Sequence, residues 1–475
     1  MDSSTAASKQ QAGGDGVGRA LLALAVLVVL LAAAALTRSL AMGVALAGLG
    51  AVAALVLWLN PALSRLSFWV FVAILVAAIP AGNLRPPGMP GMFMAYRVLL
   101  GVFVCLLAAR LALRGGRLEV RLRGGPALLW VPILGWALLS LLWCEDLAAG
   151  ARYVIFLTVG LFLVFCIREY AREPQRLRVM VVASIAIAVV VILFGLFERA
   201  TDIHLPESSR LAKIAAERYR WMITSVFHNT NEFATYIALW VPVFAVAVFG
   251  SRSLRVRAAS AGICAVAVYC LLCTASRANM LALGLALVTL CALLWLRRPV
   301  YVAAVIVVAA AAGLYGLQTF TGSAGSHQLS ALEMGTVIAE GARARGGLVR
   351  DGLFLLSQTY GAGVGAGNVE GHMAQLGHHI QNVHNWWLEV LVNLGFIGAT
   401  AYVLFYVATA LGLFHVYRRS PDRWLGLTAL GFLSGWIGFA IGCLSSSSLI
   451  AWAPMWIYVG LCVGIIQAGS VSEEA

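Results

Sequence analysis

Residues 384–398, HNWWLEVLVNLGFIG, place polar side chains at the start of an apolar run. His384 could take a proton from a hydroxyl group, because imidazole titrates near physiological pH. Asn385 could orient the imidazole ring or an acceptor molecule by hydrogen bonding. Trp386 and Trp387 fit an aromatic belt at a membrane–water interface. We therefore take His384 as a candidate general base and Asn385 as an orienting residue, with a solvated interfacial histidine as the alternative.

Arginines form the second group of side chains that could carry chemistry. The guanidinium fork makes paired, charge-assisted hydrogen bonds to phosphate oxygens and stays protonated, so it suits a pyrophosphate. Six candidates for pyrophosphate binding lie outside the apolar runs or at their edges: Arg210, Arg218, Arg220, Arg277, Arg345 and Arg350. For Arg277, snorkelling to the membrane surface is the alternative interpretation.

Two further features bear on the chemistry. The glycines of TYGAGVGAGN (359–368) are either loop punctuation or a backbone that lets N–H groups approach a phosphate. The carboxylates outside the apolar runs are dispersed and include no DxD motif. The sequence therefore demands no divalent metal and no cofactor, and the arginines could neutralise the charge of a leaving group instead.

The composition indicates which elements position these residues. The chain has 475 residues, of which 61% are hydrophobic and 11% are charged, against roughly 25% charged in soluble proteins. Continuous apolar runs near the length of a transmembrane helix recur from end to end, which indicates a membrane-spanning helical protein and disfavours a barrel. The net charge of +13 is scattered over short loops, so nucleic-acid binding is not expected.

We predict an all-α, polytopic bundle of about 12–14 transmembrane helices. The expected spans are residues 20–36, 40–59, 66–80, 93–113, 127–143, 151–167, 178–197, 229–250, 258–273, 277–296, 299–319, 385–415, 424–442 and 449–467.

Arginine-rich loops alternate with arginine-poor ones, and the positive-inside rule sets the orientation. Loops 114–125, 168–177, 251–257 and 418–423 are predicted to be cytoplasmic, as are Arg297 and Arg298. The expected organisation is N-terminal transmembrane helices (1–198), a periplasmic loop (199–228), central transmembrane helices (229–319), a large and mostly helical periplasmic cap (320–383) and C-terminal transmembrane helices (384–475). Arginines in the two outer loops oppose the charge trend, which an anionic ligand there would explain.

Four stretches together resemble the O-antigen ligase family. They are the H-N-x9-G-x-x-G pattern from His384 to Gly398, the preceding GVGAGN, the TASR turn at 274–277 and F-x-N-x-N-x-F-A at 227–234. The resemblance spans about residues 199–415. A proline usually stands between the two asparagines of the last pattern, where this chain has Thr230.

The resemblance implies a glycosyltransferase of the GT-C type in the bacterial inner membrane, with membrane lipid around it and its active site facing the periplasm. Its donor would be O-antigen linked to undecaprenyl pyrophosphate, and its acceptor lipid A-core oligosaccharide. By the family pattern His384 matches the essential histidine, and Arg220 and Arg345 match essential arginines. Arg277 matches the arginine of the SR turn. Arg210, Arg218 and Arg350 rest on charge and location alone.

Other functions stay open from the sequence. O-antigen polymerases and O-linked protein oligosaccharyltransferases share the same motifs and differ in their acceptor. A transporter of lipid-linked glycans is a different class, and it would place basic groups in mid-span along a central cavity. The expected spans are nearly free of charge in their interiors. This pattern favours chemistry on one side of the membrane.

Overall fold

The computed structural model describes residues 63–84, 94–113, 125–209, 222–295, 346–378, 382–446 and 449–474. The chain divides into two compact units, Met1–Arg123 and Gly124–Ala475. The described part of the first unit consists of α3 (Leu63–Ala77), the 3-10 turn η1 (Ala81–Leu84) and α4 (Ala95–Leu113). Phe71 of α3 packs on Phe103 of α4, with 5.1 Å between ring centroids.

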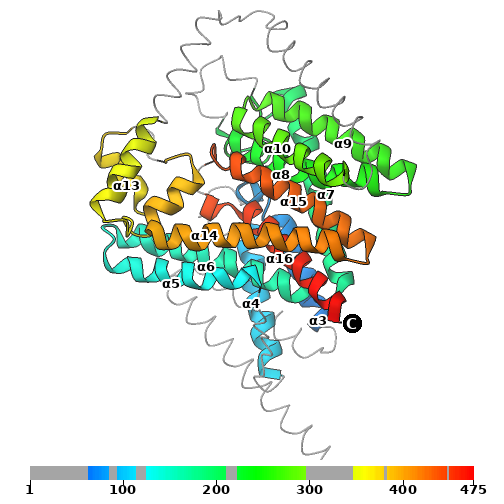
Figure 1. Cartoon of the computed structure of the whole chain (residues 1–475), viewed down its shortest axis with the longest axis horizontal. Coiled ribbons are helices and arrows are strands. Elements are labelled where there is room, and N and C mark those ends of the chain that lie inside the picture. The colour runs from blue at the N-terminus through cyan, green and yellow to red at the C-terminus, as the bar shows by residue number, and fades with distance from the viewer. Residues whose placement is uncertain are drawn as a thin grey trace, which may run out of the picture. The chain divides into compact units, whose positions relative to one another are not determined.

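The second unit contains all the candidate site residues that the structure describes, and helices α5 to α16, labelled in Figure 1, belong to it. Its elements are η3 (Pro126–Leu129), α5 (Trp130–Leu139), η4 (Ser140–Leu142), α6 (Leu147–Tyr170), α7 (Pro174–Thr201), α8 (Thr230–Gly250), α9 (Leu254–Cys273), α10 (Arg277–Trp295), a helix over 346–358, α13 (Val369–Gln375), α14 (Trp386–Arg419), α15 (Arg423–Gly442), η7 (Leu449–Ala451) and α16 (Ala453–Glu474). The regular structure of the described residues is helical throughout, which confirms the predicted fold class.

Eight of the described helices are long and apolar enough to cross a membrane: α6, α7, α8, α9, α10, α14, α15 and α16. Three shorter apolar segments correspond to α3, α4 and the run from η3 to η4. The protein is therefore a multi-pass membrane protein. The expected spans 20–36, 40–59 and 299–319 lie outside the described residues.

Helix α15 is central to the second unit, since it packs against α8, α10, α14 and α16. Aromatic side chains fill its contact with α14. Trp436 of α15 stacks on Tyr406 of α14, with 4.7 Å between ring centroids, and its indole N–H donates to the Tyr406 carbonyl at 3.0 Å. These contacts fix α14, which begins beside His384, against the middle of the bundle.

Arginine-rich loops gather at one end of this unit. The Arg178 guanidinium lies 2.8 Å from a carboxylate oxygen of Asp422, and Arg423 donates to the carbonyl of Gly250 at 3.0 Å. The loops that follow α6, α8 and α14 therefore meet. The stretches of the family resemblance lie at the opposite ends of their helices, so basic loops and candidate site residues are segregated along the bundle.

Candidate active site

The start of α14 holds the candidate base in a fixed backbone position. His384 has a left-handed φ of 46°, which is uncommon for a residue other than glycine. Its N–H donates to Oδ1 of Asn382 at 2.9 Å. Asn385 is the N-cap of α14, and its side chain accepts the N–H of Leu388 at 3.2 Å. Asn385 therefore has a structural role as a helix cap, and its role in orienting a reactant stays a prediction.

The two tryptophans after Asn385 fix this end of α14 to α15. The N–H of Trp386 donates to the carbonyl of Cys443 at 3.0 Å, and the Trp387 indole donates to the carbonyl of Ala440 at 3.0 Å. The Trp386 side chain is 1% exposed and packs on Tyr402. Our assignment of Trp386 to an interfacial aromatic belt is therefore wrong, because its indole lies inside the bundle.

A buried polar network joins the TASR turn to the same end of α15. Asn279, in the first turn of α10, donates to the Ser445 hydroxyl at 2.9 Å and accepts from the Thr235 hydroxyl at 3.0 Å. The Thr235 hydroxyl also lies 2.7 Å from that of Ser446. All four side chains are buried. Arg277 stands two residues before Asn279, with its side chain exposed at the start of α10.

These contacts bring three stretches of the resemblance together. The starts of α8, α10 and α14 meet around the segment 443–446 that follows α15. Three helix N-termini at one place carry partial positive charge from their aligned peptide dipoles. Glu232 and Glu389, in the first turns of α8 and α14, offset part of this charge. The exposed Arg277 adds a full positive charge there.

The glycine-rich stretch 359–368 packs into a break in α14. Gly395 has a φ of 62° and interrupts the helix. The carbonyl of Val392 there accepts the N–H of Val364 at 2.8 Å, and that of Asn393 accepts the N–H of Gly365 at 3.1 Å. The Trp136 indole donates to the carbonyl of Leu394 at 2.7 Å. Carbonyl groups freed by the break are thus satisfied by the loop and by α5.

The sequence allows the glycines to be either loop punctuation or a backbone whose N–H groups could approach a phosphate, and the hydrogen bonds of residues 363–366 bear on this choice. The N–H of Gly363 donates to the Thr359 hydroxyl at 3.2 Å, and that of Ala366 donates to the Ser140 hydroxyl at 3.0 Å. Together with the bonds to α14, the N–H groups of 363–366 are used within the protein. The phosphate-cradle interpretation is therefore wrong for these groups. Gly363 is required by close approach, since a Cβ there would lie 2.5 Å from the Gly395 nitrogen.

The arginines fall into two groups. Four of the six candidates lie outside the described residues: Arg210, Arg218, Arg220 and Arg345. Arg350 is on the helix over 346–358, and its side chain is 80% exposed. Its Nε donates to Oδ1 of Asp351 at 2.9 Å, and His378 Nε2 lies 2.7 Å from the other oxygen of that carboxylate. The hydrogen bonds from Arg350 and then from His378 lower the pKa of Asp351. Pyrophosphate binding by the six arginines stays a prediction.

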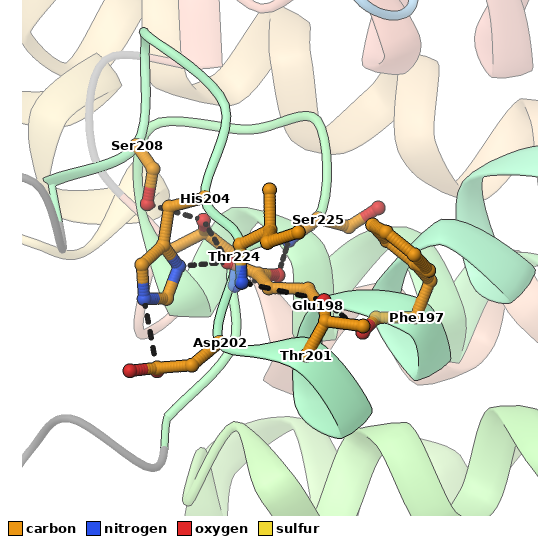
Figure 2. Close-up of polar contacts among 9 residues, drawn as sticks. Phe197, Glu198, Thr201, Asp202, His204, Ser208, Thr224 and Ser225 are labelled. Carbon is orange, nitrogen blue, oxygen red and sulfur yellow. Dashed lines mark hydrogen bonds and ion pairs between the residues drawn. The ribbon is translucent and has the colours of Figure 1, made fainter.

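Sequence reasoning missed a buried carboxylate, Glu198, in the last turn of α7 (Figure 2). One carboxylate oxygen accepts the N–H groups of Thr224 at 2.9 Å and Ser225 at 2.5 Å. The other lies 2.6 Å from Nδ1 of His204 and accepts the Thr224 hydroxyl at 3.2 Å. Three donors and the His204 ring nitrogen converge on one side chain that is 1% exposed. Such an arrangement satisfies both oxygens of a carboxyl group that is shielded from solvent.

The Glu198 network fixes the segment that leads into α8. The Ser208 hydroxyl lies 2.7 Å from that of Thr224, and the N–H of Ser209 donates to the carbonyl of His228 at 2.9 Å. Residues 208–209 are therefore bonded to 224–228, directly before the N-cap Asn229. A carboxylate at the end of an apolar run was the one available signal in the sequence, since the partners of Glu198 lie 26 and 27 residues further along the chain.

Among the residues that the structure describes, no group of three or more His, Cys, Asp or Glu side chains could hold a metal ion. Most of the arginine-bearing outer segments lie outside those residues, so independence from metal stays a prediction.

The fold and the site define a multi-pass membrane protein whose polar candidate site lies at one end of its helices. Residues 261–403 match the family model described as O-Antigen ligase, which confirms the resemblance. The matched residues include the TASR turn, GVGAGN and His384.

A curated relative, the teichuronic acid biosynthesis protein TuaE of Bacillus subtilis (strain 168), is 24% identical over 348 residues. The alignment covers 70% of this chain and 69% of that protein. The two comparisons support a glycosyltransferase-type membrane enzyme of polysaccharide biosynthesis, of the polymerase or ligase kind.

Proposed function

We propose that this protein is an O-antigen ligase of the bacterial inner membrane. It transfers O-antigen polysaccharide from undecaprenyl pyrophosphate to lipid A-core oligosaccharide on the periplasmic face. The observation that carries the proposal is the convergence of the starts of α8, α10 and α14 around residues 443–446. It puts His384 and Arg277 at the same end of the bundle, within a chain that matches the O-antigen ligase model.

The reaction proposed is a single displacement. An imidazole nitrogen of His384 takes the proton of an acceptor hydroxyl while that oxygen attacks the anomeric carbon of the donor sugar. The bond from the anomeric carbon to the pyrophosphate oxygen breaks, and undecaprenyl pyrophosphate leaves from the opposite face. The anomeric configuration therefore inverts. Asn385 keeps the start of α14 capped, so that His384 stays at a fixed depth.

Charge on the leaving group is neutralised by arginines. We assign Arg277, Arg220 and Arg345 as donors to the pyrophosphate oxygens. Arg210, Arg218 and Arg350, selected by charge and location in the sequence, are further candidates. Fixed donors that face developing charge stabilise a transition state without a metal ion. The helix N-termini of α10 and α14 act in the same direction. We therefore propose a metal-independent mechanism.

Polymerisation of the glycan is the second candidate function. The relative TuaE supports it, because its name concerns the biosynthesis of teichuronic acid and not of O-antigen. In a polymerase the acceptor hydroxyl belongs to a second lipid-linked glycan. His384 would still remove its proton, and the arginines would still neutralise the leaving group. Transfer to a protein and transport of the lipid-linked glycan are the remaining alternatives.

The test is a transfer assay with purified protein and undecaprenyl-pyrophosphate-linked O-antigen. Lipid A-core oligosaccharide, a second lipid-linked glycan and an acceptor protein are offered separately, each with and without EDTA. Product on lipid A-core that persists in EDTA and has inverted anomeric configuration supports the proposal. Product only on the second glycan identifies a polymerase, and product only on the protein identifies a protein transferase. Movement of the donor across vesicles without any product would indicate a transporter.

A further inference from the structure

A cavity of about 240 Å³ lies between the start of α6 and helix α13. Its lining residues are two carboxylates, two amides, an imidazole and a glycine: Glu145, Asp146, Asn368, Gln375, His372 and Gly371. Ligand pockets for drug-sized molecules run from roughly 300 to 1,000 Å³. This cavity is therefore suited to one part of a larger molecule, such as a single sugar ring of an oligosaccharide.

The cavity has a fixed wall and an accessible rim. The buried Asn368 accepts the N–H of Asp146 at 2.7 Å and donates to the carbonyl of the same residue at 3.2 Å. This pair joins α13 to the start of α6. At the rim Gln375 donates to the carboxylate of Glu145 at 3.2 Å, and both side chains are exposed. The backbone of the site is therefore rigid, while carboxylate and amide groups remain within reach of a ligand.

Hydrogen bonds connect this cavity to the candidate base. Glu370, on the same helix α13, accepts the side-chain N–H of Asn382 at 2.8 Å. Asn382 in turn accepts the N–H of His384 at 2.9 Å. On the other side of His384, the N–H of Trp386 donates to the carbonyl of Cys443, two residues before Ser445, which accepts from Asn279 in the first turn of α10. In the order of these hydrogen bonds, His384 therefore lies between the cavity and the TASR turn, which contains Arg277.

The chemistry of the lining selects against the donor's pyrophosphate. Glu145 and Asp146 repel phosphate, whereas carboxylate, amide and imidazole groups accept from and donate to neighbouring hydroxyls of a sugar. Exposed apolar side chains flank the site, since Leu142 is 80% and Leu147 is 60% exposed. A sugar that is carried on a lipid anchor would reach the cavity at this level of the bundle.

We propose that the cavity binds a terminal sugar of the lipid-anchored acceptor, on the opposite side of His384 from the donor pyrophosphate. The inference rests on the proposed function, because it takes the acceptor to be lipid A-core oligosaccharide. It assigns Glu145 and Gln375 to acceptor recognition. They touch the acceptor without taking part in proton transfer.

The experiment compares the wild type with Glu145→Gln and Gln375→Ala. The matched control is Glu173→Gln, which neutralises an exposed carboxylate at the opposite end of the bundle, where it pairs with Arg176. Two measurements are made on each purified protein in detergent. One is the equilibrium binding of lipid A-core oligosaccharide without donor, and the other is steady-state transfer with each substrate varied in turn.

We expect both cavity variants to weaken lipid A-core binding and to raise its KM about five- to tenfold. The kcat and the KM for lipid-linked O-antigen should stay within about twofold of wild type, as should every value for Glu173→Gln. Unchanged acceptor binding and KM in both cavity variants, in a protein that does transfer glycan to lipid A-core, would overturn the cavity assignment and leave the proposed function intact. A wild type that neither binds nor glycosylates lipid A-core would overturn both. A raised KM for the donor instead would assign the cavity to the donor glycan and overturn the inference.

Discussion

The N–H of Trp386 lies 3.0 Å from the carbonyl oxygen of Cys443, and this bond joins the start of α14 to the end of α15. Cys443 is two residues before Ser445, which accepts from Asn279 beside the TASR turn. The bond is made by backbone atoms, so side-chain changes at His384 leave it in place. Variants at His384 should therefore report on chemistry more than on folding.

Replacement of the candidate base gives the first prediction. His384→Ala should lower the rate of transfer about 100- to 10,000-fold, the range that general-base assistance contributes. Binding of the lipid-linked donor should change little, because the histidine is not assigned to the pyrophosphate. A base must be neutral to accept a proton, so the wild-type rate should rise with pH across the range in which imidazole loses its proton. Weaker donor binding by His384→Ala, with a rate that falls as pH rises, would instead indicate a cationic phosphate ligand.

The arginine at the start of α10 gives the second prediction. Arg277→Ala should cost about 30- to 1,000-fold in rate, since removal of one transition-state donor is worth roughly 2–4 kcal/mol. Arg277→Lys should recover part of this loss, because lysine supplies the charge without the guanidinium fork. Arg176→Ala, at the opposite end of the bundle, is the control. Normal transfer by Arg277→Ala at normal protein levels would place the donor site elsewhere.

The buried carboxylate of α7 gives the third prediction. Glu198→Gln replaces a carboxyl group that accepts three hydrogen bonds and contacts His204 with an amide that puts N–H groups among donors. The loss should be about 1.5–3 kcal/mol of stability, the contribution of a hydrogen bond to a charged group. The measurement is thermal unfolding in detergent, together with hydrogen exchange at Thr224 and Ser225. Glu173→Gln, at an exposed position, should leave both unchanged. Exchange at Thr224 that stays as slow as in wild type would contradict the anchoring role of Glu198.

The close contact between the glycine-rich stretch and α14 gives the fourth prediction. Gly363→Ala puts a Cβ at 2.5 Å from the Gly395 nitrogen, at a φ of 87° that other residues rarely adopt. The left-handed conformation alone costs about 1–3 kcal/mol, and the overlap adds to it. We expect a lower unfolding temperature in detergent and reduced transfer. Gly284→Ala is the control, because a Cβ there meets nothing within 4 Å. Equal stability of the two variants would contradict the packing described for Gly363.

The Asp351 carboxylate gives the fifth prediction, which concerns pH. Its pKa is lowered from the ordinary 3.8, chiefly by the hydrogen bond from Arg350 and next by that from His378. A carboxylate with a lowered pKa stabilises the folded state above its ordinary pKa, and this contribution is lost as pH falls through the lowered value. Hydrogen exchange in 346–378 should therefore be faster in Asp351→Asn than in wild type near neutral pH. The difference should vanish in strong acid, and a difference that grows as pH falls would contradict this.

Much of the fold could be predicted because the length of an apolar run is a local property. Helix α8 covers Thr230–Gly250 where we expected 229–250, and α15 covers Arg423–Gly442 where we expected 424–442. The expected span 127–143 is not one continuous α-helix. Only Trp130–Leu139 is α-helical there, between 3-10 turns that begin at Pro126 and end at Leu142.

The contacts that build the site could not be predicted in the same way. The bond from Asn279 to Ser445 joins positions 166 residues apart, and neither residue type marks a partner at that distance. Trp386 was misassigned because a tryptophan near a span boundary fits both an interface and a packed interior. The motif residues His384 and Arg277 could be selected because their charge and polarity are unusual beside apolar runs.

The break in α14 has a consequence for protein engineering. Carbonyl groups of Val392 and Asn393 depend on donors from residues 364 and 365, and that of Leu394 depends on the Trp136 indole. Removal of the glycine-rich stretch would leave backbone acceptors unsatisfied in an apolar setting. The glycine-rich stretch and helix α14 are thus not interchangeable modules. A chimera with a relative should exchange α5, 359–368 and α14 as one block.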